Sequence, residues 1–328
     1  MSCIKVGITS LFAELHARSI YNALTYNYDK KVLEIEKQYF NELTKVNHEV
    51  EFLPLDKEKG LEYVKWEDYD LLIYLGYFGN SEDLFWYLKN DYPDLKIALA
   101  WIGSDVITLA KMIQQRKYFT KCLLDLIDYH LVTQDIQLDE ELRKLGINAW
   151  LLPAISPRGI IPLMLMKGNR VAFYYRSGKS DEFQGTKFFL KLAEDLDDYE
   201  FIIFGRVKKE TIKLKKNKVE VLGWLDGDEY LKTLEQCSVL VDLIPHGGLG
   251  TTALEFLQSG RYVVTTRPIP YATEVKTYED LLTSVSNLLS GVDLNREASE
   301  FYQKNRSPEV VRRQFNKIMD KILNGDMG

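Results

Sequence analysis

The sequence predicts an α/β protein made of two halves, each with a parallel sheet between layers of helices. Short apolar runs alternate with helical patterns along the chain, which is typical of strand–helix–strand units. Runs such as LLIYL and IALAW are apolar throughout, as in strands that are buried on both faces. A stretch rich in proline and glycine near the middle is followed by a restart of the same alternation, which indicates two domains.

The first half contains six predicted strands and helical patterns between them. The strands are Lys5–Thr9, Val50–Leu53, Asp70–Leu75, Ile97–Trp101, Tyr129–Thr133 and Ala149–Leu152. The clearest helical patterns are Glu82–Lys89 and Leu138–Leu145. In sheets of this kind, ligands bind beyond the carboxyl ends of the strands, so the segments that follow strands are the places to look for chemistry.

The segment LPAISPRGIIPLMLMKGN carries three prolines and two glycines, a density that interrupts regular elements. We therefore expect a linker over residues 156–169. Beyond it, the predicted strands are Arg170–Tyr175, Glu200–Phe204, Val219–Leu222, Val239–Leu243 and Tyr262–Thr265, and the predicted helices are Thr186–Leu196, Asp228–Gln236 and Thr251–Gln258. A last helix is predicted over Pro308–Leu323, with Ser307 as its N-cap.

Length and composition fit two ordinary globular domains. The chain has 328 residues, of which 46% are hydrophobic and 27% charged, and its net charge of -6 gives no reason to expect nucleic acid as a partner. Cys3, Cys122 and Cys237 are too far apart for a disulfide framework or a metal site, so we expect reduced thiols in a cytoplasmic protein. No secretion signal and no apolar run of about 18 residues is recognised.

The most informative segment is VLVDLIPHGGLGTTALEFLQSGRYVVTT, residues 239–266. A buried strand is predicted to pass through Pro245 and a glycine turn into a helix that begins near Thr251. Such a turn presents backbone N–H groups and the positive end of the helix dipole, which suits a phosphate. Glu255 falls about one helical turn inside, where its carboxylate can accept hydrogen bonds from a ribose. Alternatively, the glycines serve tight packing and Glu255 only complements the helix dipole.

Two further segments follow strands in the same way. Arg176 and Lys179 end the strand of the second half that comes first, and two cations there would neutralise a diphosphate; the alternative is a solvated basic loop. In the first half, Trp101 is followed by Gly103, Ser104 and Asp105. Asp105 can be the N-cap of the next helix or a contact to a sugar hydroxyl.

Neither a metal site nor a dinucleotide fingerprint is predicted. Two DxD strings occur, Asp195-Leu-Asp197 and Asp226-Gly-Asp228, and we interpret the first as solvated and the second as a helix cap. The four histidines have no ligand spacing, and no GxGxxG follows the first strand. A basic run, Arg206–Lys218, is compatible with peripheral contact to an anionic membrane, although a solvated helix and loop is the interpretation that we favour.

Taken together, these segments resemble the GT-B glycosyltransferases, and most closely the retaining family 4. The motif of that family, E-G-F-G-x4-E, is matched by Gly248, Gly250 and Glu255, while Gly247 stands where the first glutamate belongs. Arg176 matches the family's arginine, and Gln184 stands in place of its lysine. FGR at 204–206, LGWL at 222–225 and WIGSDV at 101–106 also resemble segments of the family.

The resemblance implies two facing Rossmann-like domains with a cleft between them. It assigns residues 1–155 to an acceptor domain, 170–306 to a nucleotide-sugar domain, and 307–328 to a helix that crosses back toward the first domain. The implied reaction is metal-independent transfer of a sugar from a nucleotide diphosphate sugar to an unknown glycan, lipid or protein, with retention and without a cofactor.

The resemblance also distributes roles among the residues. Arg176, Lys179 and Asp105 are the catalytic candidates, and Trp101, Gly103 and Ser104 are on the acceptor side. The donor-binding candidates are Gly247, Gly248, Gly250, Thr251, Glu255, Arg206 and His246. The departures at Gly247 and Gln184 leave two alternatives open: a catalytically inactive protein that binds nucleotide or glycan, and a nucleotide-sugar epimerase of similar architecture.

Overall fold

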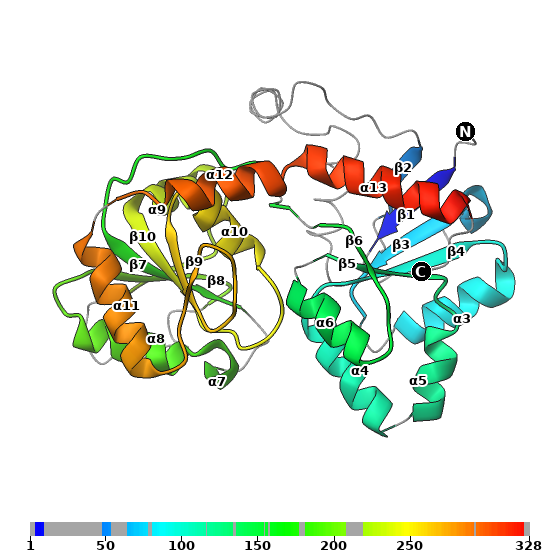
Figure 1. The fold of residues 1–328 in the computed structure, drawn as a ribbon, viewed down its shortest axis with the longest axis horizontal. Helices are drawn as coiled ribbons and strands as arrows, with labels where there is room; N and C mark the ends of the chain where they lie inside the picture. The colour runs from blue at the N-terminus through cyan, green and yellow to red at the C-terminus, as the bar shows by residue number, and fades with distance from the viewer. Residues whose placement is uncertain are drawn as a thin grey trace. The chain divides into compact units, whose positions relative to one another are not determined.

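The chain folds into two compact units, each of which is built around one six-stranded sheet (Figure 1). The first unit comprises residues 1–160 and 304–328, and the second comprises residues 161–303. The computed structural model describes residues 4–9, 48–53, 64–77, 81–115, 117–133, 136–153, 155–156, 158–176, 181–207, 219–291 and 293–324. The predicted α/β class is confirmed, and the strands of the two halves form separate sheets.

The first sheet has the strand order β2-β1-β3-β4-β5-β6, and all its pairs are parallel. Its strands are β1 (Lys5–Thr9), β2 (Glu49–Phe52), β3 (Leu71–Leu75), β4 (Lys96–Trp101), β5 (Tyr129–Val132) and β6 (Trp150–Leu151). β3 is buried over its full length, which explains why its sequence shows no alternation of apolar and polar residues. The order of the strands reverses between β1 and β3.

The second sheet is also parallel and has the order β12-β11-β10-β7-β8-β9. Its strands are β7 (Arg170–Tyr175), β8 (Phe201–Gly205), β9 (Val219–Gly223), β10 (Cys237–Asp242), β11 (Tyr262–Thr265) and β12 (Thr273–Glu274). From β7 the chain moves outward to β9 and then returns to the other side of β7 through β10. This order is that of the dinucleotide-binding folds, in which ligands bind where the order reverses.

Helices cover both faces of each sheet. In the first unit they are α3 (Ser81–Asp91), α4 (Ser104–Gln115), α5 (Lys117–Leu124), α6 (Ile136–Lys144) and α13 (Pro308–Leu323), with a 3-10 turn at Trp66–Asp68. In the second unit they are α7 (Asp181–Gln184), α8 (Thr186–Asp195), α9 (Gly227–Gln236), α10 (Thr251–Gln258), α11 (Tyr278–Ser290) and α12 (Arg296–Asn305). Most predicted elements agree with these bounds to within one or two residues.

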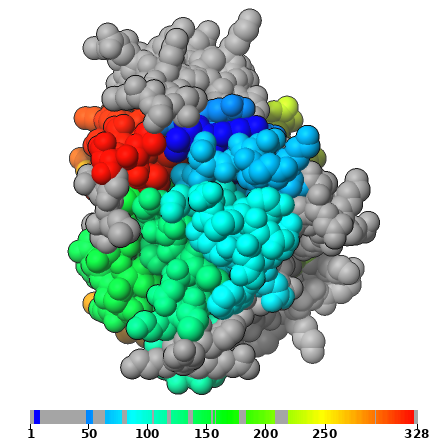
Figure 2. Space-filling view, turned by 90° about the vertical axis from the view of Figure 1, so that its right-hand side faces the viewer, coloured from blue at the N-terminus to red at the C-terminus, as the bar shows by residue number. Residues whose placement is uncertain are grey.

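The last helix belongs to the first unit. Its apolar side chains Val311, Phe315, Ile318 and Met319 pack against Val6 and Ile8 of β1 and their neighbours, and Figure 2 shows α13 beside β1 on the surface of this unit. The Ser307 side chain accepts a hydrogen bond from the Val310 N–H, and Pro308 opens the helix. The predicted cap and start are therefore confirmed.

Part of the predicted linker is fixed to the second unit. The second unit begins at Ile161. Within it, the Met164 N–H donates to the Ser259 carbonyl at 3.2 Å. The buried Arg261 guanidinium donates to the carbonyls of Met164 and Leu165. Residues 161–169 contain no helix or strand before β7, but these hydrogen bonds fix their backbone to the second unit.

Among the described residues, no helix is both long and apolar enough to cross a bilayer.

Candidate donor site in the second unit

The candidate site lies at the carboxyl ends of β7 and β10, where the strand order of the second sheet reverses. Three segments come to this edge: Arg176 after β7, the turn at residues 243–250 after β10, and the start of α10. Because this is the place where open parallel sheets bind their ligands, it is the first place to examine the predicted residues.

The start of α10 has no side-chain cap at its N-cap residue, because that residue is Gly250, and the side chain that follows, Thr251, is half-buried. The Leu254 N–H donates to the Gly250 carbonyl at 2.9 Å, so the N–H groups without a partner inside the helix are those of the first turn. Such N–H groups, at the positive end of the helix dipole, favour an anion.

Arg176 stands beside this helix start. Its guanidinium donates to Asp242 Oδ1 at 3.2 Å, and 24% of its side chain is exposed. A Cβ atom at Gly250 would lie 3.1 Å from Arg176 Nη2, so the absence of a side chain at Gly250 allows the guanidinium to approach the turn. The backbone N–H of Arg176 donates to Gln184 Oε1 at 2.6 Å, which fixes the chain as it leaves β7.

Asp242 and Arg267 form a buried ion pair, and Asp242 also pairs with Arg176. Arg267 Nη2 donates to Asp242 Oδ2, and its other nitrogens donate to the carbonyls of Gly248 and Gly247 and to Thr265 Oγ1. Burial alone would raise the pKa of the Asp242 carboxyl, but the guanidinium groups of Arg176 and Arg267 outweigh it and lower that pKa below its usual range. Asp242 is therefore a carboxylate that holds two arginines.

Glu255 lies within α10, on a helix whose residues from 252 to 258 are all buried. Only 2% of its surface is exposed. The predicted spacing of about one helical turn is correct, but the carboxylate is enclosed in this structure rather than presented at the surface. Its role in binding a ribose stays a prediction.

The remaining donor candidates differ in their surroundings. His246 is half-buried, and Gly247 has a φ of 87°, in the left-handed region that favours glycine. The Arg206 guanidinium lies 5.4 Å from the ring centre of Trp224, and the Trp224 indole is 43% exposed. Lys179 and residues 208–218 of the basic run lie outside the described residues.

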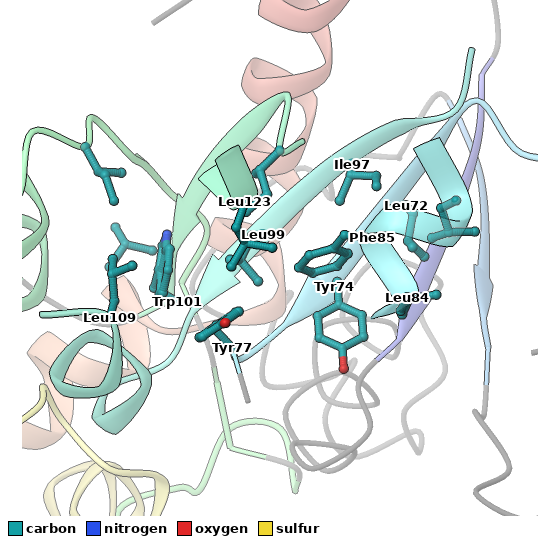
Figure 3. Packing of buried hydrophobic residues seen from close by; sticks show 14 of the residues in the cluster. Leu72, Tyr74, Tyr77, Leu84, Phe85, Ile97, Leu99, Trp101, Leu109 and Leu123 are labelled. Atoms are coloured by element: carbon teal, nitrogen blue, oxygen red, sulfur yellow. The ribbon is translucent and has the colours of Figure 1, made fainter. Parts of the chain in front are cut away.

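In the first unit, the predicted acceptor-side residues form a closed turn. Trp101 is fully buried in the core, between Leu109 and Tyr77 (Figure 3), and its Nε1 donates to His130 Nδ1 at 3.3 Å. Gly103 is buried, and Ser104 is the first residue of α4. An acceptor at this edge would therefore meet the backbone of the turn and not the indole of Trp101.

Asp105 is 1% exposed and is not at the N-cap position, because it is the second residue of α4. Its carboxylate accepts the backbone N–H groups of Tyr77, Ile102, Gly103 and Val106. Burial raises the pKa of this carboxyl, and the backbone hydrogen bonds oppose that shift. These bonds give Asp105 a structural role in tying the segment after β3 to the turn after β4.

The two DxD strings are engaged in other contacts. Asp195 Oδ2 accepts the Tyr278 hydroxyl at 2.5 Å. Asp226 occupies the N-cap position of α9 without a capping hydrogen bond, because its Oδ1 accepts the Trp224 indole N–H at 2.6 Å. No group of three or more His, Cys, Asp or Glu side chains in the described part of the chain is placed to hold a metal ion.

A large depression of about 690 Å³ lies at the opposite, amino-terminal end of the second sheet. Its lining carries three basic and three acidic side chains, and two ion pairs join four of them: Lys167 with Glu235, and Arg170 with Glu200. Because opposite charges cancel there, this depression offers a phosphate less than the edge that carries Arg176.

Sequence reasoning missed three residues that build the site: Asp242, Arg267 and the role of Gln184. Asp242 is the only charged residue in the buried run CSVLVDLI, and a charge at the end of a buried strand is a signal of a site. Arg267 follows the end of β11 by two residues, and a charged residue just after a buried strand is a second signal. Gln184 was noted only as the residue that stands where the family has lysine.

Comparison with known proteins indicates the fold. No protein-family model matches the sequence, and no curated protein sequence matches it. A glycosyltransferase from Rickettsia africae is similar in structure, with a TM-score of 0.63 at 11% identity, covering 99% of this chain and 100% of that one. A Listeria monocytogenes protein assigned as a UDP-N-acetylglucosamine 2-epimerase gives 0.54 at 13% identity and covers 100% and 99%.

The pneumococcal O-GlcNAc transferase GtfA, solved with UDP and GlcNAc, gives a TM-score of 0.54 at 13% identity over 77% of this chain. The chain spans 57% of the length of that transferase. These similarities identify the α/β architecture as that of GT-B glycosyltransferases.

Proposed function

We propose that this chain is a glycosyltransferase that moves a sugar from a nucleotide diphosphate sugar to an acceptor with retention of configuration, in the manner of family 4. The observation that carries the proposal is the edge formed by β7 and β10, where Arg176 lies beside a glycine turn and the uncapped start of α10. A guanidinium fork and the backbone N–H groups of a turn and a helix start at one edge are the kinds of donor that a diphosphate requires.

In the proposed reaction, the acceptor hydroxyl oxygen bonds to the anomeric carbon as the bond from that carbon to the diphosphate oxygen breaks. The proton of the hydroxyl passes to the leaving diphosphate. Negative charge grows on the diphosphate, so donors fixed beside it stabilise the transition state more than the ground state. We assign the stabilisation of this negative charge to Arg176, with Lys179 as the second cation.

The other donor contacts follow the turn and the helix. Gly248, Gly250 and Thr251 offer backbone N–H groups to the phosphates, and Glu255 is assigned to the ribose. The exposed ring of Trp224, with Arg206 over it, is suited to stack on a nucleotide base, a contact worth about 1–3 kcal/mol. The acceptor, a glycan, lipid or protein, is assigned to the first unit, and peripheral membrane contact is part of the proposal.

The test compares the nucleotide affinity of two variants, one with a substitution at each end of β7. A thermal-shift panel of nucleoside diphosphates selects the ligand, and calorimetry measures its Kd. Arg176→Ala should weaken binding by about ten- to a hundredfold, because a hydrogen bond to a charged group is worth about 1.5–3 kcal/mol. Arg170→Ala is the control, since Arg170 begins the same strand and pairs with Glu200 and Glu220 at the far end.

Two outcomes would overturn this assignment. If wild type binds none of the nucleotides, the donor proposal fails. If Arg176→Ala and Glu255→Gln both fold and both bind as tightly as wild type, the donor site lies elsewhere.

A second candidate function is nucleotide-sugar binding without transfer, and Gly247 and Gln184 are the observations that favour it. The motif glutamate is absent, since Gly247 stands in its place. Gln184 is neutral and accepts the Arg176 backbone N–H with its Oε1, so it supplies no cation. An epimerase is the third candidate, since a protein assigned to that activity has a similar fold. Incubation with nucleotide sugars separates them: transfer or hydrolysis releases nucleoside diphosphate, an epimerase changes the sugar, and a binding protein does neither.

A further inference from the structure

Arg267 is a deeply buried charged group at the carboxyl edge of β7 and β10, called the donor edge below, with 3% of its surface exposed. Its guanidinium donates to the backbone carbonyls of Gly247 and Gly248, to Asp242 and to Thr265 Oγ1.

The carbonyl contacts fix the direction of two peptide groups. In a trans peptide, the carbonyl oxygen and the N–H of the next residue point to opposite sides, and the described residues contain no cis peptide bond. Because Arg267 holds the carbonyls of Gly247 and Gly248, the N–H groups of Gly248 and Leu249 are directed away from Arg267. Successive N–H groups in a turn can form a concavity that binds anions, and this turn has a φ of 87° at Gly247.

The second set of contacts fixes Arg176. Asp242 accepts Arg267 on one carboxylate oxygen and Arg176 on the other. Two cations around one carboxylate leave one surplus positive charge. That surplus lies at Arg176, whose side chain is 24% exposed, and not at Arg267, whose side chain is 4% exposed.

From this geometry we propose that Arg267 and Asp242 are positioning residues for a phosphate-bearing ligand: Arg267 orients the N–H groups of the glycine turn, and Asp242 aims the Arg176 guanidinium beside them. The proposal rests on the proposed function, since it deepens the donor site. It also gives a reason for burying the Asp242–Arg267 ion pair beside Arg176, because a buried ion pair is a poor source of stability compared with apolar packing.

The experiment compares two buried arginines that both bind backbone carbonyls, of which only Arg267 lies at the donor edge and also binds Asp242. Arg267→Met is the test variant. Arg261→Met is the matched control, since Arg261 is fully buried and donates to the carbonyls of Leu234, Met164, Ser259 and Leu165, away from the donor edge. The probe is the nucleoside diphosphate that gives the largest shift with wild type, and circular dichroism confirms folding.

We expect Arg267→Met to bind the probe at least tenfold more weakly than wild type, while Arg261→Met binds it within about twofold. Arg267→Lys should fall between them, because an ammonium keeps the charge but cannot fork between Asp242 and the turn. Equal affinity of folded Arg267→Met and wild type would overturn the proposal.

Asp242→Asn separates diphosphate affinity from turnover, which a merely structural role would change together. The same variant tests the proposal if Arg267→Met does not fold. Removing the carboxylate leaves a second surplus positive charge, so diphosphate affinity should stay equal or rise. Turnover of the nucleotide sugar should fall at least tenfold, because Arg176 is no longer aimed. A parallel loss of affinity and turnover would contradict the positioning role.

The failure of this proposal differs from the failure of the proposed function. If wild type binds no nucleoside diphosphate, both fail together. If wild type binds and Arg176→Ala loses affinity while the Arg267 and Asp242 variants behave as wild type, only the positioning role is wrong.

Discussion

The two sheets carry similar aspartates at their carboxyl edges and use them in opposite ways. Asp105, after β4, is almost fully buried and accepts four backbone N–H groups from its own unit. Asp242, at the end of β10, is equally buried but accepts two guanidinium groups, one of which reaches the surface. Asp105 follows a buried strand and Asp242 is the last residue of one, and both carboxylates are engaged.

The difference lies in what remains after these contacts are made. At the first edge a carboxylate is satisfied by neutral donors, and the neighbouring Trp101 and Gly103 are buried. At the second edge the partners of the carboxylate are themselves charged, so a positive charge remains at Arg176. A buried carboxylate at a sheet edge thus indicates a ligand site only when the positive charge of its partners exceeds its own negative charge.

The largest test of this comparison is Asp105→Ala. The substitution would leave several buried N–H groups without an acceptor, each at a cost of about 1–3 kcal/mol. We expect the free energy of unfolding of the first unit to fall by about 4 kcal/mol. Four of the five tryptophans belong to this unit, so tryptophan fluorescence during urea unfolding reports on it, and Trp224→Phe removes the fifth.

Asp105→Asn is the control, since it keeps one carbonyl oxygen and should lose less stability than the alanine variant. Nucleoside diphosphate affinity should be unchanged in both. A variant that unfolds like wild type but no longer transfers sugar would show instead that Asp105 contacts the acceptor.

Sequence periodicity was sufficient to predict most of the strands and helices of the described residues. The apolar runs are long, and proline and glycine separate them, so the pattern left little choice of class. The turn at 247–250, the helix start at Thr251 and the cap at Ser307 were also predicted, because glycine, proline and serine have specific backbone roles.

The partners of the site residues could not be predicted in the same way. Asp242 and Arg267 are 25 residues apart, and only the parallel pairing of β10 with β11 brings them together. Whether a carboxylate accepts backbone N–H groups, as Asp105 does, or guanidinium groups depends on which strands are neighbours. Burial likewise separates Trp101, which is enclosed, from Trp224, which is exposed, although each follows a strand-like run.

A second test compares two glycines at neighbouring strand ends of the second unit. Gly205 ends β8 with a φ of 112°, and Gly223 ends β9 with a φ of 77°. A Cβ atom at Gly205 would overlap the carbonyl oxygen of Tyr175, next to Arg176, whereas a Cβ atom at Gly223 meets nothing within 4 Å. We expect Gly205→Ala to lower the free energy of unfolding by about 3 kcal/mol, and Gly223→Ala by about 1 kcal/mol.

Urea unfolding followed by circular dichroism measures both variants. We expect Gly205→Ala also to weaken nucleoside diphosphate binding, because the added Cβ displaces the Tyr175 carbonyl and with it the backbone of Arg176. Equal destabilisation by the two substitutions would show that the close approach at Gly205 relaxes without cost, and that only the left-handed backbone matters.

The smallest expected effect is a pH dependence confined to the first unit. Burial lowers the pKa of His130 to about 4, below the value of about 6.5 that it has in an unfolded chain. Between these values the unfolded state binds more protons than the folded state, so stability is complete above about pH 6.5 and is lost as the pH falls toward 4. The loss should reach about 2 kcal/mol at pH 5.

The matched variant is His130→Gln, which keeps an oxygen that can accept the Trp101 indole N–H but does not titrate. In the Trp224→Phe background, the free energy of unfolding of wild type should fall between pH 7 and pH 5 by about 2 kcal/mol more than that of His130→Gln. Nucleoside diphosphate affinity should show no such difference between the two proteins, since His130 belongs to the other unit. Parallel pH profiles of stability would mean that His130 is protonated in the folded state, and the first edge would then also carry a charge.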